Sequence, residues 1–169
     1  MTTEYLLDRE VDLVLAALMP ANRLVMRVAL HTGLRLSDVL TLKTAQLKPR
    51  FWVTEQKTGK RRCVGLPTQL LVDILMQAGE VWAFPGRRPG KHRTRQAVWK
   101  DVKRAARAFR LPQNVAPHSA RKVYAVKLMQ QYGDIKKVAR ALNHGHEATT
   151  MIYALADAQL QAKRPRRKK

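Results

Sequence analysis

Apolar residues recur at helical spacing through the first part of the chain. The spacing predicts one helix over residues 8–19, with Asp8 as its cap, and a second over residues 20–32. Gly33 is expected to end the second helix, because glycine readily adopts the left-handed conformation found after helix ends. Ser37 is then expected to cap a short third helix. The first forty residues therefore read as three consecutive helices.

The period changes to that of a strand in the next segment. Residues 51–55 and 62–66 read as two strands around a turn at residues 57–60, in which Gly59 supplies the unusual dihedral angles. The single cysteine, Cys63, is expected to be a small buried residue of the second strand. Three tryptophans are expected to belong to the core: Trp52, Trp82 and Trp99.

Helical spacing returns after Pro67 and runs through Leu75. A loop rich in proline, glycine and positive charge follows at residues 84–93, and Thr94 is expected to cap the helix after it. Three further helices are expected, at 118–131, 134–142 and 147–156. The predicted fold class is α+β, mostly helical, with a small antiparallel hairpin. The expected organisation is one domain over residues 1–160 and a disordered basic tail over residues 161–169.

Charge sets this chain apart from an average globular protein. It has 33 Lys and Arg against 12 Asp and Glu, a formal net charge of +21, while 46% of its residues are apolar. A domain that folds yet carries so much excess charge points to a polyanionic partner, and double-stranded DNA is the expected one. A signal peptide and a run of about 18 apolar residues are both missing, so a cytoplasmic, DNA-associated protein without a membrane partner is expected.

The polar residues narrow the chemistry. The twelve acidic residues are scattered, His144 and His146 have no carboxylate or cysteine at ligand spacing, and a phosphate-binding glycine-rich loop is missing. No metal and no cofactor are therefore expected. Metal-free phosphoryl transfer needs a nucleophile, fixed cations on the phosphate oxygens and a proton donor for the leaving oxygen. Arginine suits the second role because its planar fork holds two phosphate oxygens.

Four short motifs resemble those of the tyrosine recombinases, the phage integrase family, and the match is to the catalytic domain. They stand in the family's order over residues 32–153. The first three are Thr-Gly-Leu-Arg-Leu-Ser-Asp-Val-Leu from Thr32, Gln-Lys-Thr-Gly-Lys from Gln56 and Pro-His-Ser-Ala-Arg from Pro117. The fourth is a closing segment from Leu142, in which His144 precedes Tyr153 by nine residues. Each motif alone is common. Four in order are specific.

The resemblance implies roles for the matching residues. Arg35 and Arg121 would clamp the scissile phosphate, and Tyr153 would attack it to leave a 3′-phosphotyrosyl link. Lys57 would protonate the departing 5′ oxygen from the mobile hairpin, although Lys60 flanks the same turn and competes for this role. The remaining residues have supporting parts. His118 would assist proton transfer at the tyrosine, His144 would hydrogen-bond the phosphate, and Asp38 would orient the site from one helical turn beyond Arg35.

Contacts to the DNA backbone are expected mainly from the basic loop. The residues assigned to DNA binding are Lys60, Arg87, Arg88, Lys91, Arg93 and Arg95. Two differences from the family stand out. Residues 1–31 are too few to supply the N-terminal core-binding domain that family members carry, and Lys122 and Asn143 replace residues that are usual there.

The implied function is site-specific DNA recombination or integration. In the family manner the protein would act as a homotetramer on two DNA sites, weakly associated without DNA, with an accessory DNA-binding protein as a further partner. Two alternatives stay open: a noncatalytic DNA-binding accessory protein on the same scaffold, and DNA relaxation of the type IB topoisomerase kind. A noncatalytic protein would have no need of Tyr153.

Overall fold

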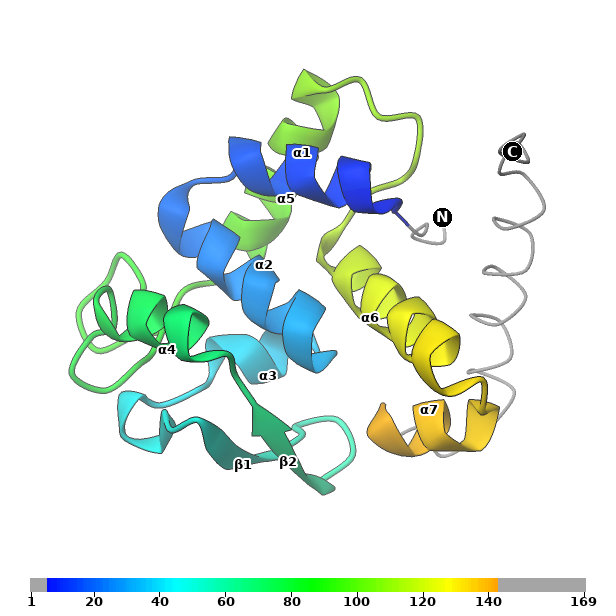
Figure 1. Ribbon diagram of the computed structural model, residues 1–169. Helices are drawn as coiled ribbons and strands as arrows, with labels where there is room; N and C mark the ends of the chain where they lie inside the picture. The colour runs from blue at the N-terminus through cyan, green and yellow to red at the C-terminus, as the bar shows by residue number, and fades with distance from the viewer. Residues whose placement is uncertain (1–5, 143–169) are drawn as a thin grey trace, which may run out of the picture. The chain divides into compact units, whose positions relative to one another are not determined.

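The computed structural model describes residues 6–142 (Figure 1). The chain divides into two compact units, Met1–Tyr124 and Ala125–Lys169, and each is described by itself. Seven α-helices lie within the described range, together with one short 3-10 helix and one two-stranded sheet. The prediction of a mostly helical α+β fold with a small antiparallel sheet is confirmed.

The first unit is built around helix α2 (Pro20–Thr32), which contacts four other helices. These are α1 (Asp8–Ala17), α3 (Leu36–Leu40), α4 (Thr68–Leu75) and α5 (Arg95–Ala108). The 3-10 helix η1 (Thr44–Gln46) follows α3, and α6 (Pro117–Tyr132) begins in this unit. Val25 and Val28 of α2 are completely buried, as are Val98 and Val102 of α5. Helix α2 is therefore the central element of the core.

Strands β1 (Arg50–Thr54) and β2 (Arg61–Gly65) form the predicted antiparallel hairpin, each starting one residue earlier than expected. Phe51 and Val53 are buried and alternate with exposed residues, because successive side chains of a strand point to opposite faces. The hairpin thus covers the core with one face and presents the other to solvent.

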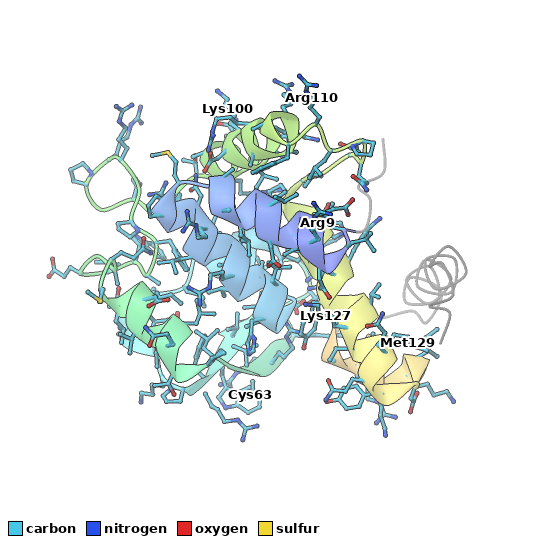
Figure 2. The ribbon with its side chains drawn as sticks, turned by 45° about the horizontal axis from the view of Figure 1, so that its top comes forward. Arg9, Cys63, Lys100, Arg110, Lys127 and Met129 are labelled. Carbon is cyan, nitrogen blue, oxygen red and sulfur yellow. The ribbon has the colours of Figure 1, made fainter. Side chains whose placement is uncertain are left out.

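The prediction that the tryptophans belong to the core is wrong for two of them. Trp52 is 57% exposed on the outer face of β1, and Trp99 is 48% exposed on α5. Cys63 also faces outward, opposite Trp52 in the register, rather than being buried as expected (Figure 2). Trp52 and Cys63 both occupy outward positions of the alternation that places Phe51 and Val53 inside.

Helix caps were predicted with mixed success. Thr94 caps α5 by accepting a hydrogen bond from the Ala97 N–H at 3.1 Å, as expected. The predictions that Asp8 and Ser37 are caps are wrong, because both residues lie inside their helices. Leu7 and Arg35 occupy the cap positions instead. At α1 the Leu7 N–H instead donates to the side chain of Glu10 at 2.7 Å, so the acidic partner comes from the first turn rather than from the cap.

The second unit contains the end of α6 and helix α7 (Ile135–Ala141). Asp134 caps α7 by accepting hydrogen bonds from the N–H groups of Lys136 and Lys137. The predicted helix 147–156 and the basic tail lie outside the described residues. Within residues 6–142, no helix is both long enough and apolar enough to cross a bilayer.

Candidate active site

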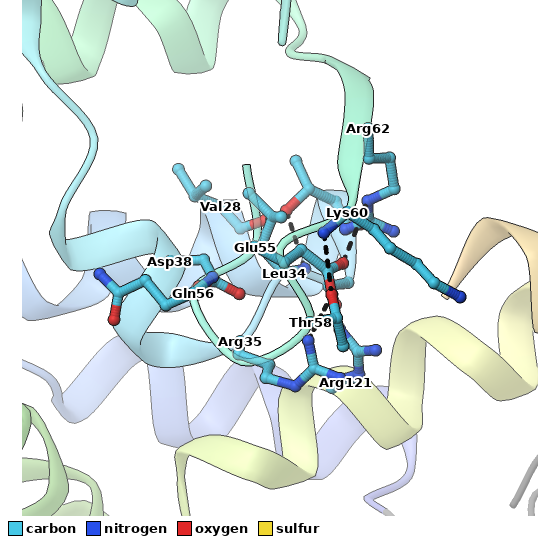
Figure 3. A network of polar contacts seen from close by, with 12 residues as sticks. Val28, Leu34, Arg35, Asp38, Glu55, Gln56, Thr58, Lys60, Arg62 and Arg121 are labelled. Carbon is cyan, nitrogen blue, oxygen red and sulfur yellow. Dashed lines mark hydrogen bonds and ion pairs between the residues drawn. The ribbon is translucent and has the colours of Figure 1, made fainter. Parts of the chain in front are cut away.

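Arg35 is placed by the tight connection between α2 and α3. Gly33 ends α2 in the left-handed conformation, with φ of 64°, and Arg35 follows two residues later as the cap residue of α3. Its side chain is 22% exposed, and its Nη1 atom donates a hydrogen bond to the Glu55 carboxylate (Figure 3). One nitrogen of the guanidinium is therefore held by protein, while part of the side chain is exposed to solvent.

Arg121 comes from the first turns of α6 and is only 2% exposed. Its Nη1 atom donates to the Gly33 carbonyl oxygen over 2.6 Å. A buried guanidinium needs such partners, because the charge loses its hydration when it is enclosed. The same tight connection that positions Arg35 thus also anchors Arg121, which joins two of the predicted motifs through the backbone of Gly33.

The hairpin turn carries both candidate lysines. The turn is closed by the Glu55 N–H, which donates to the Lys60 carbonyl at 3.0 Å, and by the Gly59 N–H, which donates to the Glu55 carbonyl at 2.8 Å. Gly59 has φ of 65°, as expected for the residue that lets the chain reverse. Lys57 and Lys60 are both exposed.

His118 lies in the first turn of α6 with part of its surface open to solvent. Desolvation by the surrounding protein is the main effect, and it lowers the pKa of His118 from its ordinary value of 6.5. Four cations lower it further: Arg121, Lys122, Arg35 and Lys57. The lowered pKa favours the neutral imidazole, whose free nitrogen can accept a proton.

Asp38 is almost completely buried in α3, at 1% exposure. Its Oδ1 atom accepts a hydrogen bond from the Gln56 N–H over 3.0 Å (Figure 3). Within residues 6–142, its second oxygen has no hydrogen-bond partner. The described contact of Asp38 is thus with the backbone of the hairpin turn, directly before Lys57.

Sequence reasoning missed Glu55. This residue is completely buried, and it pairs with Arg35 and lies beside Arg62. A signal was present in the strand alternation, since residues 51, 53 and 55 point to the same side and the first two are apolar. A carboxylate at an inward position calls for a buried cation, because acidic side chains are almost never fully buried unless they are paired.

The basic loop predicted to contact DNA is tied together by its own backbone, with the Gly86 N–H donating to the Lys91 carbonyl over 2.7 Å. Four of its assigned residues are exposed: Arg87, Arg88, Lys91 and Arg95. Arg93 differs, because it is half-buried and donates to Asn22 Oδ1 over 3.1 Å. Its guanidinium has a partner within the fold, whereas the other four have the exposure that a DNA contact requires.

His144 and Tyr153 lie outside the described residues, so the structure gives no account of the two remaining motif residues. Across the described part of the chain, no group of three or more His, Cys, Asp or Glu side chains is arranged to hold a metal ion.

The chain is similar in sequence to a family of known proteins. The family model described as "Phage integrase family" matches residues 4–159. The integrase/recombinase y4qK of Sinorhizobium fredii is 35% identical over 129 residues, which cover 72% of this chain and 42% of the relative. The tyrosine recombinase XerD of Pseudomonas putida is 28% identical over 154 residues, which cover 83% of this chain and 51% of the relative. The chain thus spans about half the length of these relatives.

Solved structures with the same fold include two phage integrases. The catalytic domain of bacteriophage HP1 integrase superposes with a TM-score of 0.67 at 24% identity, covering 95% of this chain and 93% of that one. A lambda integrase dimer bound to a COC′ core site gives a TM-score of 0.78 at 19% identity, covering 100% of this chain and 52% of that one. At such identities the likeness establishes the fold. Together with the match over residues 4–159, it shows that the chain belongs to the phage integrase family, the tyrosine recombinases.

Proposed function

We propose that this chain is the catalytic domain of a site-specific recombinase, which breaks and rejoins double-stranded DNA through Tyr153. One observation carries the proposal. The Gly33 carbonyl, two residues before Arg35, accepts a hydrogen bond from the buried Arg121, so two arginines far apart in the sequence are anchored at one connection. The charges of both arginines and of Lys57 also lower the pKa of His118. Cations gathered beside an imidazole suit an anion that also needs a proton acceptor, as a phosphodiester attacked by a hydroxyl does.

The proposed reaction is a transesterification. The Tyr153 oxygen attacks phosphorus, the bond from phosphorus to the 5′ oxygen breaks, and Lys57 gives its proton to the departing oxygen. The products are a 3′-phosphotyrosyl link and a free 5′-hydroxyl, and attack by a 5′-hydroxyl in the reverse direction rejoins the strand. A phenol with a pKa of about 10 is a poor nucleophile until its proton is taken. The neutral imidazole of His118 is suited to assist that step.

The two arginines neutralise the charge of the pentavalent transition state. Arg121 is buried and fixed on the Gly33 carbonyl, whereas Arg35 is partly exposed beside Glu55. Preorganised donors stabilise a transition state better than mobile ones, because they need no reorganisation during the reaction. His144 is proposed to add a hydrogen bond to the same phosphate, and Asp38 to support the hairpin.

The proposed partner is double-stranded DNA, in keeping with the net charge of +21 and with relatives named as recombinases and integrases. The exposed cations of residues 87–95 and Lys60 are proposed to contact its backbone. The working assembly is proposed to be a homotetramer on two DNA sites, weakly associated without DNA and located on the nucleoid in the cytoplasm, with an accessory DNA-binding protein as a further partner.

The test is covalent capture of DNA. Purified protein is incubated in EDTA with negatively supercoiled plasmid and with a library of nicked duplexes of random sequence, and SDS-resistant adducts are recovered. The wild type is expected to form adducts and Tyr153→Phe to form none, while both bind DNA. Tyr132→Phe serves as the matched control, because Tyr132 is an exposed tyrosine at the end of α6. DNA binding without any wild-type adduct would instead favour the noncatalytic accessory protein.

A further inference from the structure

Glu55 lies where the hairpin turn meets the core. It is the residue after β1, and its side chain has no exposed surface. Phe51 and Val53 precede it at the two other inward positions, so an apolar residue would continue the pattern. A buried carboxylate paired with arginine is often no more stabilising than apolar residues of similar volume. Stability alone therefore does not account for a charge at this position.

Two guanidinium groups flank the Glu55 carboxylate from opposite sides. Arg35 Nη1 donates to one oxygen, and Arg62 Nε lies 3.8 Å from the other (Figure 3). Arg62 is itself held, because its Nη2 atom donates to the Thr32 carbonyl over 2.9 Å. The carboxylate thus lies beside a held guanidinium on one side and accepts a hydrogen bond from a proposed phosphate-binding arginine on the other.

The backbone of the same residue closes the turn that carries Lys57. The Glu55 N–H donates to the Lys60 carbonyl, and the Glu55 carbonyl accepts from the N–H groups of Thr58 and Gly59. Its side chain also accepts a hydrogen bond from the Thr58 hydroxyl at 3.3 Å. A displacement of Glu55 would therefore move Arg35 and the base of the lysine turn together.

We infer that Glu55 is a positioning residue for the strand-cleavage reaction. It holds one nitrogen of Arg35, which leaves the other donors of the guanidinium available to a phosphate, and it couples Arg35 to the turn that presents Lys57. The inference rests on the proposed function. It assigns Glu55 no contact with the DNA and no proton transfer, because its side chain is completely buried.

The first measurement is the rate constant of single-turnover cleavage by Glu55→Gln. The substrate is a nicked duplex that was recovered as a covalent adduct with the wild type. The amide keeps the shape of the side chain but lacks the charge that fixes Arg35. The cleavage rate constant is expected to fall about tenfold to a hundredfold, the scale of loss when a reacting group is misplaced. The dissociation constant for DNA is expected to change less than about twofold, since backbone contacts elsewhere supply most of the affinity.

Asp101→Asn is the matched control. Asp101 is also a buried carboxylate held by an arginine, at 7% exposure, and its contacts are with Met19, Asn22 and Arg104 rather than with the site. This variant is expected to lose stability while keeping the wild-type rate per folded molecule. Equal rates per folded molecule for Glu55→Gln and Asp101→Asn would overturn the inference.

A second readout does not depend on cleavage. The Arg35 guanidinium NH signals, assigned with Arg35→Lys, are expected to be shifted and slowly exchanging in the wild type and to collapse in Glu55→Gln. Unchanged signals would overturn the inference even if the enzyme is slow. If Glu55→Gln does not fold, Glu55→Asp keeps the charge with a shorter reach, and the same two measurements apply. Absence of any wild-type adduct would overturn the proposed function, whereas the NMR result would still decide whether Glu55 orders Arg35.

Discussion

Replacement of Gly33 by alanine tests how the connection between α2 and α3 builds the site. Gly33 has φ of 64°, a conformation that costs an L-residue roughly 1–2 kcal/mol. An added Cβ would also lie 2.2 Å from Cδ1 and 2.5 Å from Cε1 of Tyr124, so the ring or the backbone must shift. Such overpacking typically costs about 1–3 kcal/mol. The expected loss is therefore about 2–5 kcal/mol, out of the roughly 5–15 kcal/mol that stabilises a typical domain.

The assay is urea unfolding of Gly33→Ala beside Gly90→Ala. Gly90 has nearly the same backbone angle, φ of 69°, but an added Cβ there meets no atom within 4 Å. Gly90→Ala therefore carries only the conformational cost of about 1–2 kcal/mol, and the difference between the variants isolates the clash with Tyr124. Equal free energies of unfolding for the two variants would refute the reasoning. Loss of cleavage beyond the loss of folded protein is also expected, because the Gly33 carbonyl holds Arg121.

Two further predictions concern ionisable groups. Burial opposes ionisation of Asp101, yet hydrogen bonds from Asn22, Arg104 and the Met19 N–H hold its pKa below the ordinary value. The ionised Asp101 carboxylate thus contributes to stability above about pH 3.9, and this contribution is lost as the pH falls through the lower folded pKa. Asp101→Asn should lower the free energy of unfolding by about 1–3 kcal/mol at neutral pH, measured in thermal melts, and by less in acid. The pKa of His118 should fall below its ordinary value in an NMR titration, and Lys57→Met should raise it, whereas Lys100→Met on exposed α5 should not.

The elements that were predictable are those whose signals are local. Helix α2 was expected over residues 20–32 and is found there, because a proline can start a helix and a glycine in the left-handed conformation can end one. The cap at Thr94 and the hairpin were also predictable, because their signals come from residues close together in the sequence. The wrong caps at Asp8 and Ser37 are errors of one or two residues, which arise because helix ends depend on contacts outside the helix as well as on residue type.

The partners of the candidate site were less predictable than its members. Arg35, Lys57, His118 and Arg121 carry motif signals, and the charges of the three cations lower the pKa of His118. The groups that fix the two arginines are visible only in the structure. A backbone carbonyl holds Arg121, and a buried carboxylate holds Arg35. A carbonyl has no sequence signature, because every residue carries one. Tyr153 and His144 lie outside the described residues, and their roles stay predictions.

The cations of the candidate site differ in exposure, and the difference suits their proposed tasks. Arg121 is 2% exposed and anchored on backbone, the Arg35 side chain is 22% exposed, and Lys57 lies on an exposed turn. A guanidinium that stabilises a transition state works best when it is rigid. A proton donor to a departing oxygen must instead follow an atom that moves away, and a lysine on a hairpin can do so. Exposure therefore rises from Arg121 to Lys57 in the order that the proposed strand cleavage requires. Glu55 contacts both Arg35 and the turn that carries Lys57.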